Sequence, residues 1–79
     1  MDKRSLSIAG HRTSIALEAE FWEALEAMAA EKAVPMARLI RDIDENRTSP
    51  NLSSAARLAV LAWYRRRAEG AAGTEAPTS

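Results

Sequence analysis

The chain has 79 residues, and its 11 lysines and arginines balance its 11 aspartates and glutamates. A chain of this length forms one small domain with a limited core, and the absence of cysteine excludes both disulfides and thiolate metal sites as stabilising devices. Oligomerisation is the remaining way for so small a domain to gain stability. No segment is apolar enough for a secretion signal or a membrane span, so we expect a cytoplasmic protein without a membrane partner.

The charges are segregated along the chain, although their sum is zero. Residues 1–17 are basic, residues 18–31 carry five glutamates, and residues 51–68 contain four arginines and no acid. Phosphate binding depends on local clusters of lysine and arginine. The zero net charge therefore does not exclude a nucleic-acid partner.

The first expected element is a β-strand in the stretch HRTSIAL. Thr13, Ile15 and Leu17 alternate with more polar or smaller residues, which is the period of a half-buried strand. A single strand is not stable in water, and no later segment has a strand pattern. We therefore expect this strand to pair with the same stretch of a second chain.

The residues before this strand change its register. Leu6 and Ile8 occupy even positions, whereas Ile15 occupies an odd one, so the switch must occur at Gly10. We favour a bulge or bend within one strand. The alternative is a hairpin with a type II′ Gly10-His11 turn, with Leu6 opposite Ile15 and Ile8 opposite Thr13; its greater width would disfavour DNA binding through this face.

Three helices are expected after the strand. Apolar residues at helical spacing predict helices over residues 18–32, 36–46 and 52–68, and the last begins at an Asn51 or Ser53 cap. The third is apolar on more than one face, which indicates that a partner subunit covers part of it. Residues 1–4 are expected to be a flexible end, residues 5–68 the domain, and residues 69–79 a disordered tail.

The sequence shows no cluster of residues suited to catalysis, metal binding or phosphate binding. His11 is the only histidine, it has no neighbour at metal-ligand spacing, and no glycine-rich loop is available for a phosphate. The sequence predicts a protein that is not an enzyme and has no cofactor, metal or small-molecule substrate.

The order of strand, helix and helix resembles the ribbon-helix-helix DNA-binding proteins (the Arc/CopG/MetJ class). The resemblance is carried by RTSIALEAEFWEALEAMAAEKAVPMARLI and by NLSSAARLAVLAWYR, covers residues 5–67, and extends to a bacterial subfamily of ribbon-helix-helix domain proteins. It implies a mainly α fold in which two chains intertwine and pair their strands into an antiparallel ribbon. Such a ribbon enters the major groove of double-stranded DNA, and the second helix begins at a phosphate.

Transferred to this sequence, the resemblance assigns roles to three groups of residues. The expected base contacts are Arg12, Ser14 and Ala16, with Arg12 the strongest reader. The expected phosphate contacts are Lys3, Arg4, Ser53, Ser54 and Arg57. The expected dimer core consists of Ile15, Leu17, Phe21, Trp22, Leu25, Leu39, Ile40, Ile43, Leu58, Leu61 and Trp63.

Two assignments stay open. By spacing, the second helix of the family corresponds to residues 36–45, whereas the better capped N-terminus for a phosphate is Asn51-Leu52-Ser53-Ser54. The run of arginines at residues 65–67 suits either a DNA backbone or the negative end of a helix dipole.

The function expected from these features is that of a homodimeric DNA-binding transcriptional regulator, a repressor. Two alternatives use the same fold without sequence-specific reading of DNA. One is a protein-interaction module, which the zero net charge and the small set of base readers favour. The other is an antitoxin, against which the tail GAAGTEAPTS counts because it lacks apolar anchors.

Overall fold

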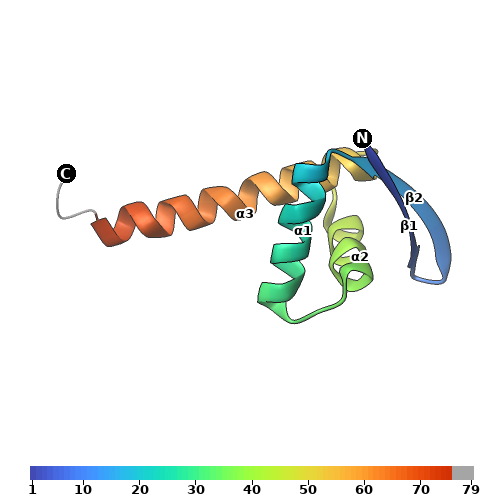
Figure 1. Cartoon of the computed structure of the whole chain (residues 1–79), viewed down its shortest axis with the longest axis horizontal. Helices are drawn as coiled ribbons and strands as arrows, with labels where there is room; N and C mark the ends of the chain where they lie inside the picture. Colours follow the sequence, from blue (N-terminus) through green and yellow to red (C-terminus); the bar gives the residue numbers. More distant parts are fainter. Residues whose placement is uncertain (76–79) are drawn as a thin grey trace.

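The computed structural model describes residues 1–75 of the chain. The elements follow in the order β1 (Asp2–Ile8), β2 (His11–Leu17), α1 (Ala19–Lys32), α2 (Met36–Asn46) and α3 (Leu52–Glu75). The hairpin lies at one end of the molecule, α1 and α2 pack beside the first half of α3, and the second half of α3 extends away from them (Figure 1). The expected mainly helical fold with three helices is confirmed.

The two strands form a hairpin within one chain, so the single strand with a bulge or bend at Gly10 was wrong. β1 and β2 pair antiparallel, with Ile8 opposite His11 and Leu6 opposite Thr13. This register is also displaced by two residues from the hairpin considered as the alternative. It pairs even positions of β1 with odd positions of β2. The apolar residues of both strands therefore lie on one face without a bulge.

The turn consists of Ala9 and Gly10, and both have positive φ, at 53° and 84°. Two successive residues with positive φ make the type I′ turn, whose twist matches that of the flanking strands. Asparagine or glycine is usual at the first position, and alanine is rare there. The Gly10-His11 turn of the alternative hairpin thus lies one residue later in the sequence than the turn in the structure.

Helix α1 ends in a motif that normally requires glycine. Ala33 has φ 57° and donates to the carbonyl of Ala30 at 3.1 Å, and Val34 donates to the carbonyl of Ala29 at 3.0 Å. These two bonds are the Schellman pattern. Pro35 then takes an extended conformation as the N-cap residue of α2, which begins at Met36.

Helix α3 starts at its expected cap and continues further than expected. The Asn51 Oδ1 atom accepts hydrogen bonds from the backbone N–H groups of Ser53 and Ser54, at 2.8 and 3.3 Å. The helix runs to Glu75 instead of ending near Ala68, so it includes part of the expected disordered tail; residues 76–79 lie outside the described part of the chain. At the other end, β1 begins at Asp2, within the expected flexible end.

The core lies between the inner face of the hairpin and the three helices. Seven of the residues expected in a dimer core are buried within this one chain: Ile15, Leu17, Trp22, Leu25, Leu39, Ile40 and Trp63. Each buried leucine or isoleucine contributes about 1.5–3 kcal/mol of transfer free energy. Phe21 and Ile43 are half-buried against this core, whereas Leu58 and Leu61 are exposed by 56% and 51%.

The left-handed conformation of Ala33 makes a stability prediction. Ala33→Gly should raise the free energy of unfolding by about 0.5–1 kcal/mol, because glycine adopts positive φ without steric cost. The matched control is Ala27→Gly at an exposed position inside the same helix, which should lower it by about 1 kcal/mol. Urea unfolding measures both, and a loss of stability in Ala33→Gly would contradict the assigned C-terminus.

Candidate nucleic-acid interface

One face of the hairpin points away from the helices. We call it the outer face, and it consists of Lys3, Ser5, Ser7, Arg12, Ser14 and Ala16. The register makes three cross-strand pairs of these residues, because side chains at directly opposed positions share a face. Five of the six residues are exposed, and Ala16 is half-buried. All three expected base contacts therefore lie together on one exposed surface.

The outer face is basic and contains no acid. Lys3 and Arg12 are not among the residues whose ion pairs are seen in the described part of the chain. The hydroxyl groups of Ser5 and Ser14 lie 3.2 Å apart across the strands and form a hydrogen bond. Ser5 and Ser7 were missing from the expected contacts, because only a hairpin register places them beside Ser14 and Arg12.

Arg4 belongs to the opposite face and is held there. Its guanidinium group lies over the Trp22 ring, 4.6 Å from the ring centroid, and its Nη1 atom donates to the Glu26 carboxylate at 3.0 Å. The indole N–H of Trp22 donates to the carbonyl of Asp2 at 2.9 Å. These contacts attach β1 to α1, so a phosphate contact by Arg4 would require it to leave both partners.

Arg57 is also engaged within the chain. Its Nε and Nη2 atoms donate to the two carboxylate oxygens of Glu18 at 3.0 and 3.3 Å, and its guanidinium group lies 5.7 Å from the centroid of the Phe21 ring. This bidentate pair joins the start of α1 to α3. A hydrogen bond from its own backbone N–H, followed by the bond from Arg57, lowers the pKa of Glu18.

The two candidate helix N-termini differ in how their N–H groups are occupied. At α3 the N–H groups of Ser53 and Ser54 are bound by Asn51, so they are not open to a phosphate in this conformation. At α2, no side chain caps the helix after Pro35. The start of α2, which corresponds by spacing to the second helix of the family, is therefore the more open of the two.

The arginines at residues 65–67 do not act as one cluster. The Arg67 Nη1 atom donates to the Glu31 carboxylate at 3.0 Å, and its guanidinium group lies 4.7 Å from the Trp63 ring centroid. The indole N–H of Trp63 donates to the other oxygen of Glu31 at 3.5 Å. Arg65 and Arg66 are exposed. One of the three arginines thus holds α3 against α1.

Other kinds of site find no support in the part of the chain that the structure describes. No group of three histidine, cysteine or acidic residues there is arranged to hold a metal, and His11 lies exposed beside the hairpin turn. No helix among the described residues has the length and hydropathy needed to cross a membrane.

The comparison with protein families agrees with the geometry of the hairpin and helices. The family model of the ribbon-helix-helix domain matches residues 1–64 of the sequence. These residues include both strands, α1, α2 and the first half of α3. No curated protein and no solved structure shows a significant match to the chain.

The lowered pKa of Glu18 predicts a pH dependence. A carboxylate with a lowered pKa stabilises the fold above its unfolded-state pKa, near 4.5, and this contribution is lost as the pH falls through its folded-state pKa. Glu18→Gln should therefore be less stable than the wild type at neutral pH, and the difference should shrink in acid. Urea unfolding across this pH range measures it.

Glu23→Gln is the matched control, because Glu23 is exposed on the same helix and is in none of the ion pairs of the described residues. Its stability relative to the wild type should stay constant across the range. A constant difference for Glu18→Gln as well would contradict the role of the ion pair with Arg57.

Proposed function

Because the chain belongs to the ribbon-helix-helix family, whose members are non-enzymatic DNA-binding proteins, we propose that it is a homodimeric transcriptional repressor that reads the major groove with the outer face of its hairpin. The observation that carries this proposal is the composition of that face. It holds two cations without an acid, three hydroxyl groups and one methyl group. These are the groups that contact phosphates and base edges.

The width of the hairpin, which we expected to disfavour this mode of binding, limits which strands can enter the groove. The major groove is about 12 Å wide and admits a two-stranded ribbon. Adjacent strands lie about 4.8 Å apart, so two paired strands fit within that width, whereas the four strands of a dimer of hairpins, about 14 Å across, exceed it. If two β2 strands pair in a dimer, they lie deepest in the groove and each β1 strand lies toward a phosphate backbone.

In this arrangement the residues of the outer face have two roles, contact with bases and contact with phosphates. Arg12 on β2 can grip the O6 and N7 atoms of guanine, Ser14 can donate to or accept from several bases, and Ala16 can contact the methyl group of thymine. We assign to Lys3 on β1 a contact with phosphate. Arg4 and Arg57 stay outside the proposed interface because they are held by carboxylates within the chain.

Dimerisation is proposed through the free edge of β2. In a hairpin closed at Ile8 and His11, the backbone groups of alternate residues, including Ser14, point away from the partner strand. Such an edge pairs readily with another strand. Leu58, Leu61 and Tyr64 add an exposed apolar stripe on α3, each more than half exposed, that a second chain would cover.

The same apolar stripe supports a second candidate function, a protein-interaction module that does not read DNA. Arg12 is the only outer-face residue of β2 able to form a bidentate bond with a base, which limits sequence specificity. The two candidates differ in whether binding to DNA depends on Arg12.

The proposed reading of DNA is tested with fragments selected from a random pool. Arg12→Ala should weaken binding to selected fragments by about 1–3 kcal/mol and change binding to random fragments less. Lys3→Ala should weaken both equally and reduce the slope of log affinity against log salt by about one. Fluorescence anisotropy at several salt concentrations measures these effects.

Arg65→Ala is the control, because Arg65 is exposed on the projecting half of α3. It should leave the affinity of selected fragments nearly unchanged. A loss in Arg65→Ala with none in Arg12→Ala would move the DNA contact to the C-terminal arginines. No binding by any form of the chain would favour the interaction module.

The proposed dimer is tested by placing proline on the two edges of the hairpin. Ser14→Pro removes a backbone donor at the free edge of β2, while Ser5→Pro removes one at the outer edge of β1, directly across the strands. Sedimentation at micromolar concentration should show that only Ser14→Pro shifts the dimer toward monomer. Equal dissociation in both variants would contradict pairing through β2.

A further inference from the structure

A pocket with an apolar interior lies between the three helices. Its volume is about 320 Å³, and its lining includes Met28 from α1, Leu39 and Ile43 from α2, and Ala59 from α3. These four residues are buried or half-buried. A volume of this size lies at the lower end of the range of small-molecule sites, about 300–1,000 Å³, and such sites combine apolar walls with a few polar groups.

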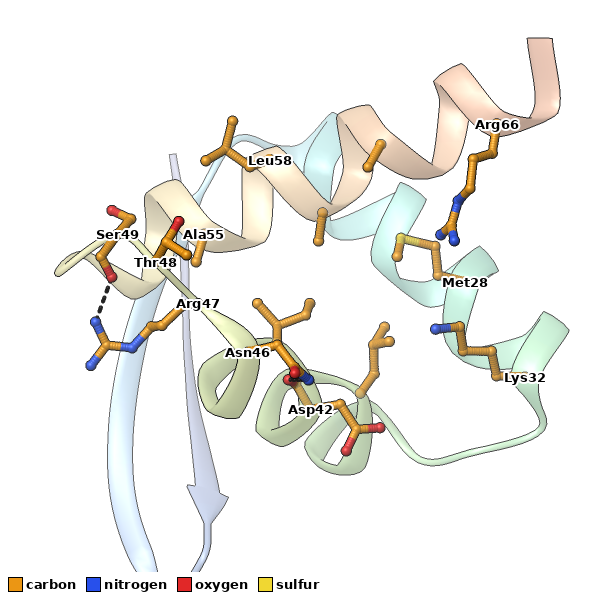
Figure 2. Close-up of a pocket in the computed structure, with 14 residues that line it drawn as sticks. Met28, Lys32, Asp42, Asn46, Arg47, Thr48, Ser49, Ala55, Leu58 and Arg66 are labelled. Carbon is orange, nitrogen blue, oxygen red and sulfur yellow. Dashed lines mark hydrogen bonds between the residues drawn. The ribbon is translucent and has the colours of Figure 1, made fainter. Parts of the chain in front are cut away.

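Two cations lie at the mouth of this pocket. Figure 2 shows Lys32, from the end of α1, and Arg66, from α3, directed toward the space between these helices. Both side chains are exposed, and neither is in an ion pair within the described part of the chain. The acid nearest to Lys32 in sequence, Glu31, is occupied by Arg67 at 3.0 Å and by Trp63.

The other charged residues that line the pocket are already paired. Arg47 donates to the carboxylate of Asp44 at 2.7 Å and to the carbonyl of Ser49, and the latter bond is drawn in Figure 2. Asp42 forms an ion pair with Arg38 at 3.7 Å. The charges that remain available to a ligand are therefore the two cations at the mouth of the pocket.

We infer that this pocket binds a small amphipathic anion, an organic carboxylate with an apolar body. The apolar body lies against Met28, Leu39 and Ile43, and the carboxylate lies between Lys32 and Arg66. A neutral molecule with the same body gains the apolar contacts and loses the charge-assisted hydrogen bonds. This site shares no residue with the outer face of the hairpin and does not depend on DNA binding, but it shares Leu58 with the apolar stripe proposed for dimerisation.

The charge requirement is tested by calorimetric titration of the full chain with octanoate and with octanol, which has the same chain length and no charge. Octanoate should bind saturably, and octanol about tenfold more weakly or not at all. The double variant Lys32→Gln, Arg66→Gln should lose about tenfold in affinity for octanoate and keep its affinity for octanol.

Arg65→Gln is the matched control for charge, because Arg65 is exposed beside Arg66 and does not line the pocket. It should bind octanoate as the wild type does. Equal binding of octanoate and octanol, or an equal loss in Arg65→Gln, would overturn the proposal, since either shows that the two cations do not hold the carboxylate.

The location is tested by filling the pocket. Ala62 lines it and is exposed, so Ala62→Phe should block octanoate without unfolding the chain, whereas Ala68→Phe, at an exposed position outside the pocket, should not. Circular dichroism and Tm show that both variants are folded. Unchanged binding in Ala62→Phe overturns the proposal. An absence of octanoate binding, with dimerisation altered by Ala62→Phe, also overturns it and assigns the pocket to a contact between two copies.

Discussion

The attachment of the hairpin to Trp22 sets the arrangement of the rest of the molecule. Trp22 is 1% exposed, its indole N–H donates to the Asp2 carbonyl, and Arg4 covers its ring. Because β-strand side chains alternate, fixing one face of β1 against α1 leaves the other face in water. The exposed basic surface of the hairpin is thus a consequence of how the opposite surface is packed. Buried aromatic area and a satisfied N–H act together here, since an unpaired buried donor would cost about 1–3 kcal/mol.

Seven of the eleven cations of this chain fall into two groups with different uses. Arg4, Arg57 and Arg67 each pair with a glutamate of α1 or its N-cap and lie near an aromatic ring, so they join separate elements. Lys3, Arg12, Lys32 and Arg66 have no such carboxylate partner in the described residues. Three of the eight glutamates, Glu18, Glu26 and Glu31, are therefore paired with these structural arginines. A chain with zero net charge can in this way keep basic surfaces for binding anions.

The sequence was sufficient for the strand over HRTSIAL, for three helices and for the family, because each rests on a local period or a proline break. It was insufficient for the hairpin, since a change of parity at Gly10 fits a bulge and a turn equally, and Ala9 is not a residue that signals positive φ. The pairing of Arg57 with Glu18 spans 39 positions and has no local pattern. Ala-rich residues beyond 68 continue α3 because alanine has a high helix propensity, which the small and polar character of the tail obscured.

The two tryptophans of the chain lie at two different contacts between elements, which we call joints. Trp22 connects α1 to the hairpin, and Trp63 connects α3 to α1 through Glu31 and Arg67. Both are buried with their N–H groups bound, so each indole changes its solvent environment when its own joint opens. Replacing one tryptophan at a time would leave a single fluorophore at the other joint. The molecule therefore carries two separate optical reporters, which distinguish loosening of the hairpin from detachment of α3.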